Sequence, residues 1–371
     1  MKGTFDVGQP FDSGLGNLAN NALGKALAIL RSGPPGIRIR LGGDAVSGHS
    51  RKDPENNRMV TYSYRLQLSP KHGLITKLKF YEFDDRFTVI SETEYDVEGY
   101  AFIHDFALTK NYYVIPQNPV SFDIAGYASG QKCAIHCVKW QPFRQLKIHA
   151  IPRPVSPKSA QVIEVTPSSF IYHFANGFES EDENSIVLDA LSYPRFPDFG
   201  FLLEPGKKYV DIDPDQTPIG RLHRITLGLD DGHGSATAYS PRAMEFPRIN
   251  PSVTGRPHRY VYTAAALHPH FNRPPQAIAK VDTETGTATL WSRGFRYYTA
   301  EPAFVPRGKA QGPPAGSTDI AEDDGWLVAL CYDAEKQRSE LVILDALQIE
   351  NGPVAVLPLQ DSIPHGTGSL Q

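Results

Sequence analysis

Residues 59–68 read Met-Val-Thr-Tyr-Ser-Tyr-Arg-Leu-Gln-Leu, and residues 74–83 read Leu-Ile-Thr-Lys-Leu-Lys-Phe-Tyr-Glu-Phe. A third run of the same kind, Thr88-Val-Ile-Ser-Glu-Thr-Glu-Tyr95, follows after a short break. All three runs alternate in polarity and are rich in β-branched and aromatic residues, which is the pattern of half-buried β-strands. We therefore expect each of them to form a strand.

Similar runs recur along the rest of the chain. They are Gln161–Val165, Tyr260–Ala264, Ala277–Val281, Gly325–Tyr332 and Glu340–Asp345. The segment Asp282-Thr-Glu-Thr-Gly286 separates two strand-like runs and is typical of a hairpin turn. The 31 glycines and 31 prolines are spread over the whole chain, which disfavours long helices, and the one good helix candidate is Asn17–Leu30.

The number and spacing of these strands predict an all-β fold with few short helices. Many short strands indicate a sandwich, a barrel or a propeller. The 371 residues exceed a sandwich of about 100 residues, whereas seven blades of a propeller need about 300. We therefore expect residues 1–371 to form one domain, a seven-bladed β-propeller that is complete or incomplete, although no Trp-Asp repeat is present.

Composition excludes several classes of protein. The 37 Lys and Arg residues against 41 Asp and Glu give a net charge of −4, which argues against a nucleic-acid partner because such binding needs a basic surface. Three cysteines cannot form a disulfide framework, which favours a reducing compartment and a cytoplasmic location. No apolar run reaches the length of a membrane span, and the start lacks the pattern of a signal peptide.

Two of the cysteines, Cys133 and Cys137, flank His136 at a spacing that a zinc site could use. No second Cys or His pair of matching spacing follows, so we favour two small apolar residues around a loop. The neighbouring segment Ile124–Val138 has only scattered apolar residues, and membrane contact is expected to be peripheral at most.

Four of the twelve histidines stand out from the rest. His104 and His173 interrupt apolar runs, and a polar group buried there must be hydrogen-bonded or bound to something. His49 follows Ser47-Gly48, and His365 lies close to the end of the sequence. A single histidine of this kind is more often a satisfied core residue than a ligand. Together, their wide spacing excludes a local motif but suits a site on an axis to which separate blades contribute, and imidazoles without thiolates suit Fe, Cu or Zn.

Five motifs around these histidines resemble those of the carotenoid cleavage oxygenase family, which includes the lignostilbene dioxygenases. They are Ser47-Gly-His-Ser-Arg-Lys-Asp-Pro54, Phe102-Ile-His-Asp-Phe-Ala-Leu-Thr109, Tyr172-His-Phe-Ala-Asn-Gly-Phe-Glu179, Met244-Glu-Phe-Pro-Arg-Ile-Asn250 and Thr299-Ala-Glu-Pro-Ala-Phe-Val-Pro-Arg307. Their order along the chain is also that of the family, and the similarity runs from about residue 17 to the last residue.

This resemblance implies a seven-bladed propeller that holds Fe(II) on four histidines, His49, His104, His173 and His365. It implies a dioxygenase that uses O2 to split a double bond of an apolar small molecule, an apocarotenoid or a stilbene, into two carbonyl products. No catalytic residue beyond the metal site is expected.

Two glutamates complete the expected site. By resemblance, Glu245 and Glu301 orient His173 and the C-terminal histidine by accepting a ring N–H. The other interpretation of both residues is an ordinary surface glutamate, but their apolar Phe-Pro and Pro-Ala-Phe contexts disfavour full exposure.

Two departures from the family pattern support a second reading. Arg31 stands where the family places a third glutamate that accepts the ring N–H of a metal-binding histidine. A guanidinium has no acceptor for that N–H. The sequence also stops soon after His365, without the strand that usually follows in the family. The alternative is therefore a catalytically impaired or inactive paralogue, or a truncated gene model, that at most binds apolar ligands. An unrelated binding propeller is disfavoured by the five motifs. The choice between carotenoid and stilbene stays open, because Gly33-Pro-Pro35 and Tyr332–Lys336 resemble the stilbene-cleaving branch, whereas Leu30 replaces the phenol-binding lysine of that branch.

Overall fold

The computed structural model describes residues 39–69, 73–154, 156–197, 217–269, 274–307 and 321–363. Within them the α-helices are short, α2 (Ile124–Ala128) and α3 (Ala134–Cys137), and two 3-10 turns are present, η4 (Pro251–Val253) and η5 (Ile349–Asn351). None of the helices in this part of the chain is long and apolar enough to cross a membrane. The predicted all-β class is confirmed, whereas the helix predicted at Asn17–Leu30 lies outside the described residues.

Nearly all of the strands belong to blades, most of which follow the chain as a meander. Blade 1 contains β1 (Ile39–Val46), β2 (Arg51–Asp53), β3 (Arg58–Ser69), β4 (Gly73–Phe83) and β5 (Val89–Glu98). Blade 2 contains β6 (Ala107–Leu108), β7 (Tyr112–Gln117), β10 (Leu146–Pro152) and β11 (Gln161–Thr166). Blade 3 contains β12 (Phe170–Glu179), β13 (Ser185–Tyr193), β14 (Arg221–Gly228) and β15 (His233–Ala238).

Two further blades complete the described part of the ring. Blade 4 contains β16 (Met244–Arg248), β17 (Tyr260–Ala265), β18 (Ala277–Asp282) and β19 (Ala288–Trp291). Blade 5 contains β20 (Tyr297–Pro306), β21 (Gly325–Asp333), β22 (Arg338–Asp345) and β23 (Pro353–Pro358). The propeller prediction is therefore confirmed, and the described residues supply five blades of it, an incomplete ring. That residues 1–371 form a single domain stays a prediction.

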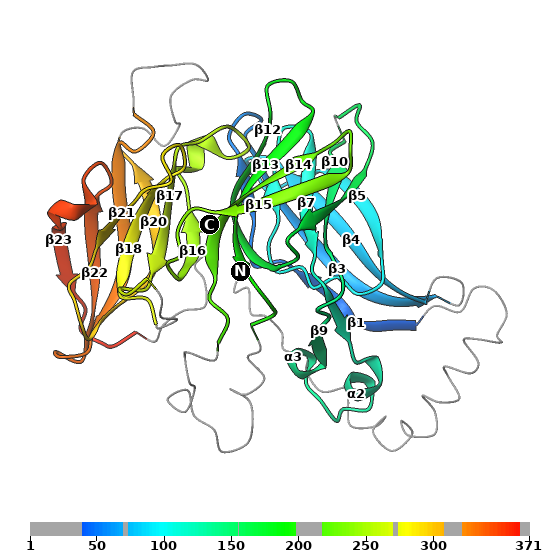
Figure 1. Ribbon diagram of the computed structural model, residues 1–371, viewed down its shortest axis with the longest axis horizontal. Helices are drawn as coiled ribbons and strands as arrows, with labels where there is room; N and C mark the ends of the chain where they lie inside the picture. Colours follow the sequence, from blue (N-terminus) through cyan, green and yellow to red (C-terminus); the bar gives the residue numbers. More distant parts are fainter. Residues whose placement is uncertain are drawn as a thin grey trace.

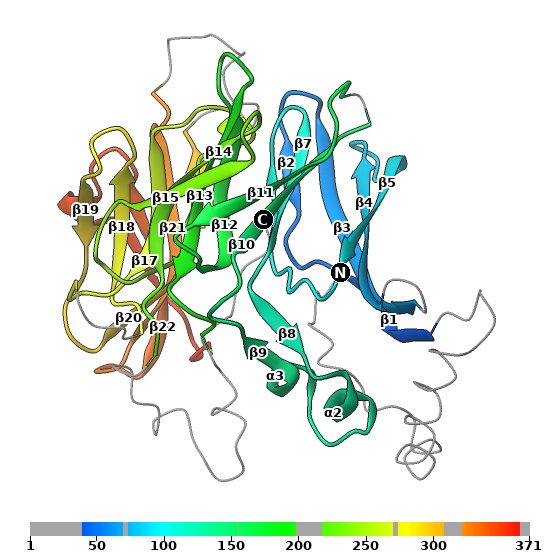
Figure 2. The same ribbon diagram turned by 45° about the vertical axis from the view of Figure 1, so that its right-hand side comes forward.

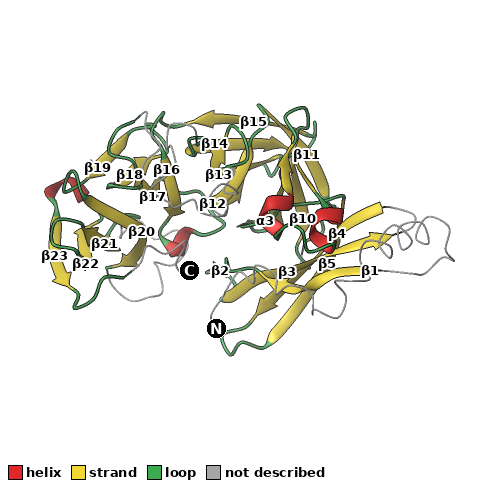
Figure 3. Cartoon of the chain, turned by 90° about the horizontal axis from the view of Figure 1, so that it is seen from below, coloured by secondary structure: helices red, strands yellow, loops and turns green. Residues whose placement is uncertain are grey.

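The blades follow one another around an arc. Figure 3 shows this arc from below, from blade 1 on the right through blades 2 and 3 at the top to blades 4 and 5 on the left. The hairpin β8 (Val120–Phe122) and β9 (Val138–Trp140), with α2 and α3 between its strands, projects below the blades in Figures 1 and 2. This excursion interrupts blade 2 between β7 and β10.

The local pattern of the sequence explains these strands. Burial alternates along β4, as the alternating polarity of residues 74–83 predicts, and it also alternates along β21, although residues 325–332 form a continuous apolar run. The hairpin predicted at Asp282–Gly286 joins β18 to β19, where Gly286 has a φ of +72° and its N–H donates to the Asp282 carbonyl at 2.8 Å. A positive φ favours glycine, so this residue suits the turn.

One strand from near the start of each blade lies next to its counterpart in the following blade, and these strands are called the inner strands. Contacts join β2 to β6, β6 to β12, β12 to β16 and β16 to β20. This arrangement brings together parts of the chain that are far apart in sequence, as expected at the centre of a propeller. A residue on or just before an inner strand is therefore placed to share a site with its counterparts in other blades.

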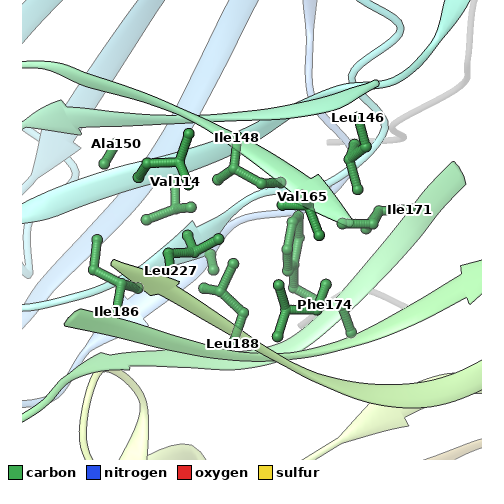
Figure 4. Packing of buried hydrophobic residues seen from close by; sticks show 14 of the residues in the cluster. Val114, Leu146, Ile148, Ala150, Val165, Ile171, Phe174, Ile186, Leu188 and Leu227 are labelled. Atoms are coloured by element: carbon green, nitrogen blue, oxygen red, sulfur yellow. The ribbon is translucent and has the colours of Figure 1, made fainter. Parts of the chain in front are cut away.

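Apolar cores fill the spaces between blades. The core between blades 2 and 3 contains Ile148, Val165, Phe174 and Leu188, all of them essentially inaccessible to solvent (Figure 4). A second core joins blades 1 and 2, where the rings of Phe80 and Tyr113 stack at 4.3 Å. Since each core takes side chains from two blades, the packing fixes how neighbouring blades are oriented.

We expect Ile148→Ala to destabilise the protein by about 2–5 kcal/mol, because it leaves a cavity in the core between blades 2 and 3. Urea unfolding followed by circular dichroism measures this loss. Val162→Ala is the matched control, since Val162 lies on the neighbouring strand β11 and is 47% exposed, and it should change stability by at most about 0.5 kcal/mol. Equal losses in the two variants would contradict the assigned core.

Candidate metal centre

Three of the four histidines predicted from the sequence meet at the centre of the arc. His49 lies just before β2, His104 lies before β6, and His173 lies in β12. Their candidate ligand nitrogens all lie within 4.8 Å of one another, and this is the one such group of metal-binding side chains among the described residues. The predicted convergence is thus confirmed. His365 lies outside the described residues, and its role as a ligand stays a prediction.

The three imidazoles face one another closely. The Nε2 atoms of His49 and His104 are 3.1 Å apart, and the three ring centroids are separated by 4.8, 4.9 and 5.1 Å. Two nitrogens that bind one ion at about 2.1 Å, roughly at right angles, would lie about 3 Å apart. The Nε2 atom of His173 is buried and has no hydrogen-bond partner within the described residues. This spacing fits ligands that share one metal ion.

Burial governs the charge of these rings. It lowers the pKa of His104 to about 2 and also lowers the pKa of His49, so both are neutral at pH 7 and offer a lone pair. Burial opposes the charged form of His173 as well, but the Glu245 carboxylate outweighs it and raises the pKa of His173 above its ordinary value. The cluster therefore contains two neutral imidazoles and a third imidazole, His173, whose charged form the Glu245 carboxylate stabilises.

Glu245 contacts His173, which is the pairing that the family resemblance implies. The Nδ1–H of His173 donates to Glu245 Oε2 at 2.6 Å, which leaves Nε2 as the nitrogen that can bind a metal. The second carboxylate oxygen, Oε1, accepts a hydrogen bond from the Tyr193 hydroxyl. Burial and the nearby Glu245 charge hold the pKa of Tyr193 well above its ordinary value, so this hydroxyl keeps its proton. A chain of hydrogen bonds, Tyr193 to Glu245 to His173, thus fixes one imidazole.

Irregularities in the strands point these side chains inward. The register of β12 against β13 shifts on both sides of His173, and β16 shifts between Glu245 and Arg248. The same occurs in β20 between Thr299 and Pro302, the stretch that contains Glu301. A bulge re-aims a side chain and is frequent beside functional sites. Proline, which cannot donate to a ladder, is tolerated at such positions.

Glu301 lies in β20, which contacts β16, the strand that carries Glu245. It is almost buried and forms an ion pair with Arg248 of β16. Glu301 is predicted to orient the C-terminal histidine, but His365 lies outside the described part of the chain. Arg31 lies outside it as well, so its predicted effect stays a prediction. The reading of Glu245 and Glu301 as ordinary surface glutamates is wrong, because their side chains are only 19% and 9% exposed.

Several residues of the site carry no role in the sequence analysis. Arg248 and Asp105 lie inside the quoted motifs. A charged residue beside an apolar run indicates a buried, paired charge, and this pattern could have identified both residues. Tyr193 ends β13, and nothing in its local pattern indicates a partner 52 residues away. The ring of Tyr172 lies 4.3 Å from that of His104, which gives the site an aromatic wall.

We expect Glu245→Ala to weaken metal binding by about tenfold or more, because His173 loses the acceptor that orients it. Tyr193→Phe removes one donor to the same carboxylate and should have a smaller effect in the same direction. Competition with a metallochromic chelator measures both affinities. Glu164→Ala, at a half-exposed surface position, is the control and should bind like the parent. Unchanged affinity in the Glu245 variant would count against its assignment.

Comparison with known proteins identifies relatives of this architecture. The family model described as retinal pigment epithelial membrane protein matches residues 27–367. Apocarotenoid-15,15'-oxygenase of Synechocystis is 34% identical over 361 residues, which cover 97% of this chain and 68% of that protein. Isoeugenol monooxygenase of Pseudomonas putida is 26% identical over 325 residues, covering 84% of this chain and 62% of that protein.

Solved structures agree with these matches. The crystal structure of cobalt-substituted Synechocystis apocarotenoid oxygenase superposes with a TM-score of 0.76 at 34% identity, over 88% of this chain and 64% of that chain. The present chain thus spans about two thirds of the length of the relatives that it matches. Because the family model covers residues 27–367 and the fold, the motifs and the histidine cluster all agree with it, this chain belongs to the carotenoid oxygenase family.

Proposed function

We propose that this chain is a non-haem Fe(II) dioxygenase that cleaves a carbon–carbon double bond of an apolar alkene with O2. The observation that carries the proposal is the cluster of His49, His104 and His173, which three separate blades bring within 4.8 Å. Two relatives, an apocarotenoid oxygenase and an isoeugenol monooxygenase, support oxidation of an unsaturated apolar substrate.

The donor set supports iron as the metal. The described residues of the cluster offer only imidazole nitrogens, and such ligands suit Fe, Cu, Zn or Ni. Cobalt can replace the native metal in the related Synechocystis enzyme, which is consistent with a divalent ion. Three imidazoles leave further positions for His365, O2 or substrate, and Fe(II) bound here would supply the electrons that activate O2.

The proposed reaction is balanced without another reductant. One alkene and one O2 give two carbonyl compounds: the carbon–carbon double bond and the O–O bond break, and each former alkene carbon receives one oxygen. Other residues of the protein fix the orientation of the metal-binding histidines and would surround the substrate. Glu245 keeps His173 in one tautomer, and Tyr193 keeps Glu245 in place.

Aromatic side chains beside the cluster favour a flat, conjugated substrate. Tyr172 contacts His104 and belongs to an apolar cluster with Phe102, Phe170 and Phe196. Aromatic faces bind extended π-systems through burial of area and offset stacking. Apocarotenoids and stilbenes both satisfy this requirement.

One observation favours the second candidate, an impaired member of the family. The Nδ1 atom of His49 is buried and has no hydrogen-bond partner within the described residues. An imidazole without an outer acceptor is held less firmly and binds metal more weakly. In this case the chain would bind apolar ligands without turnover.

Iron content and reaction products together separate the two candidates. The full chain is reconstituted anaerobically with Fe(II), desalted and analysed for metal, and then given apocarotenals or resveratrol in air. We expect close to one iron per chain and aldehyde products that each carry one labelled oxygen from 18O2. Absence of stoichiometric iron would overturn the proposed function, whereas iron without products would favour the impaired protein.

A further inference from the structure

A buried ion pair lies directly behind the histidine cluster. Arg51, two residues after His49, donates to Asp105, which follows His104, at 2.6 Å. The two side chains are 7% and 1% exposed. The pair therefore joins blade 1 to the segment that enters blade 2, at the level of two of the three histidines.

The same pair also reaches the third histidine segment. Asp105 Oδ2 accepts a hydrogen bond from the backbone N–H of Phe174 at 2.8 Å, and Phe174 follows His173. Arg51 in turn donates to the carbonyl oxygens of Phe174 at 2.8 Å and of Phe106 at 2.9 Å. The remaining oxygen of Asp105 accepts from the N–H of Phe106 at 2.7 Å. The two side chains thus belong to the segments of His49 and His104 and bind the backbone of Phe106 and of Phe174, the residue after His173.

From these contacts we infer that Asp105 and Arg51 are positioning residues that set the spacing of His49, His104 and His173. The inference rests on the proposed function, in which these histidines bind a metal. A carboxylate can accept several hydrogen bonds at fixed directions, and a guanidinium presents a rigid fork of donors. The pair can therefore hold three backbone segments in one arrangement before any ion binds.

Stability alone is a poor explanation for this pair. Burying two charges costs about as much as their attraction returns, and apolar side chains of similar volume often serve equally well. The shifts in register around His173 and Phe174 place the Phe174 N–H at Asp105. A metal site must be held to within about 0.5 Å by supporting contacts, and the pair supplies such contacts to all three segments.

Cobalt binding tests the inference with a readout other than activity. The metal-free full chain is titrated with Co(II), and both the dissociation constant and the visible d–d absorption bands are recorded. We expect Asp105→Asn to weaken Co(II) binding by about tenfold or more and to change the bands, because an amide has a single acceptor oxygen and cannot accept from both the Phe174 and the Phe106 N–H. The far-ultraviolet circular dichroism should remain that of a folded β-protein.

A matched control separates positioning from burial of charge. Glu340 of blade 5 is also a buried carboxylate, paired with Arg293 at 2.7 Å. Glu340→Gln should lower the midpoint of thermal unfolding but keep the parent's Co(II) affinity and bands. If Asp105→Asn does not fold, Arg51→Lys takes its place, since it keeps the charge and loses the fork. A folded Asp105 or Arg51 variant with the parent's affinity and bands would overturn the inference, whereas a parent that binds no Co(II) would overturn the proposed function instead.

Discussion

His173→Ala is expected to weaken Fe(II) binding by more than about 100-fold. Loss of a residue that only hydrogen-bonds to a metal ligand costs about 10- to 100-fold in affinity, and loss of the ligand itself should cost more. The substitution removes one of three candidate ligand nitrogens within 4.8 Å and leaves the Glu245 carboxylate without the His173 donor. An ion bound by the remaining His49 and His104 nitrogens would have no ligand from blade 3, the blade that contains His173. Anaerobic Fe(II) titration with metal analysis after desalting measures the effect.

His233→Ala is the control for that experiment. His233 is an exposed residue of β15, remote in sequence from the cluster and absent from it. This variant should retain the parent's iron content. Iron retention by His173→Ala at the parent's level would show that the cluster is not the metal site.

Arg153→Met is expected to destabilise the protein by about 3–5 kcal/mol at pH 7, because it leaves buried carboxylates without their partner. Arg153 is 2% exposed and donates to Glu82 at 2.9 Å and to Asp53 at 2.7 Å. These contacts join the end of β10 in blade 2 to β4 and β2 in blade 1. Urea unfolding at neutral pH provides the measurement.

The size of this loss should depend on pH. Burial opposes ionisation of Glu82 and Asp53, but hydrogen bonds from Arg153 and their other partners outweigh it and hold both pKa values below the ordinary 4.5 and 3.8. Groups with a lowered folded pKa stabilise the fold above their ordinary pKa and lose this contribution as the pH falls. The difference between parent and Arg153→Met should therefore be largest near pH 7 and shrink below pH 4.5.

The surface pair of Arg307 with Asp324 provides a matched control. Arg307 is 40% exposed, and Arg307→Met should cost at most about 1 kcal/mol, with little dependence on pH. A loss in Arg153→Met as small as that of Arg307→Met would contradict the role assigned to the buried cluster.

Local sequence patterns were sufficient to predict the strands and to single out candidate site residues, whereas the set of metal ligands and the role of Glu245 came from the resemblance of five motifs to a known family. The alternation in residues 74–83 reports burial on one face, so β4 follows from it directly. His104 and His173 could be singled out because each interrupts an apolar run, and the Phe-Pro context of Glu245 indicated partial burial. Each of these signals lies within a few residues of the position that it describes.

Features that depend on distant partners could not be predicted in this way. The parallel pairing of β11 with β15, which merges blades 2 and 3 into one sheet, has no counterpart in the alternation of either strand. Arg153 and Asp53 are 100 residues apart, and Tyr193 and Glu245 are 52 apart. Only the packing of one blade against the next brings such residues together.

The most direct test of the account is the position of the metal itself. Crystals of the full chain loaded with Fe(II) can be measured on both sides of the iron absorption edge to give an anomalous difference map. We predict one peak about 2 Å from Nε2 of each of His49, His104 and His173. A map without a peak among these three nitrogens, or with the iron bound elsewhere, would contradict the account.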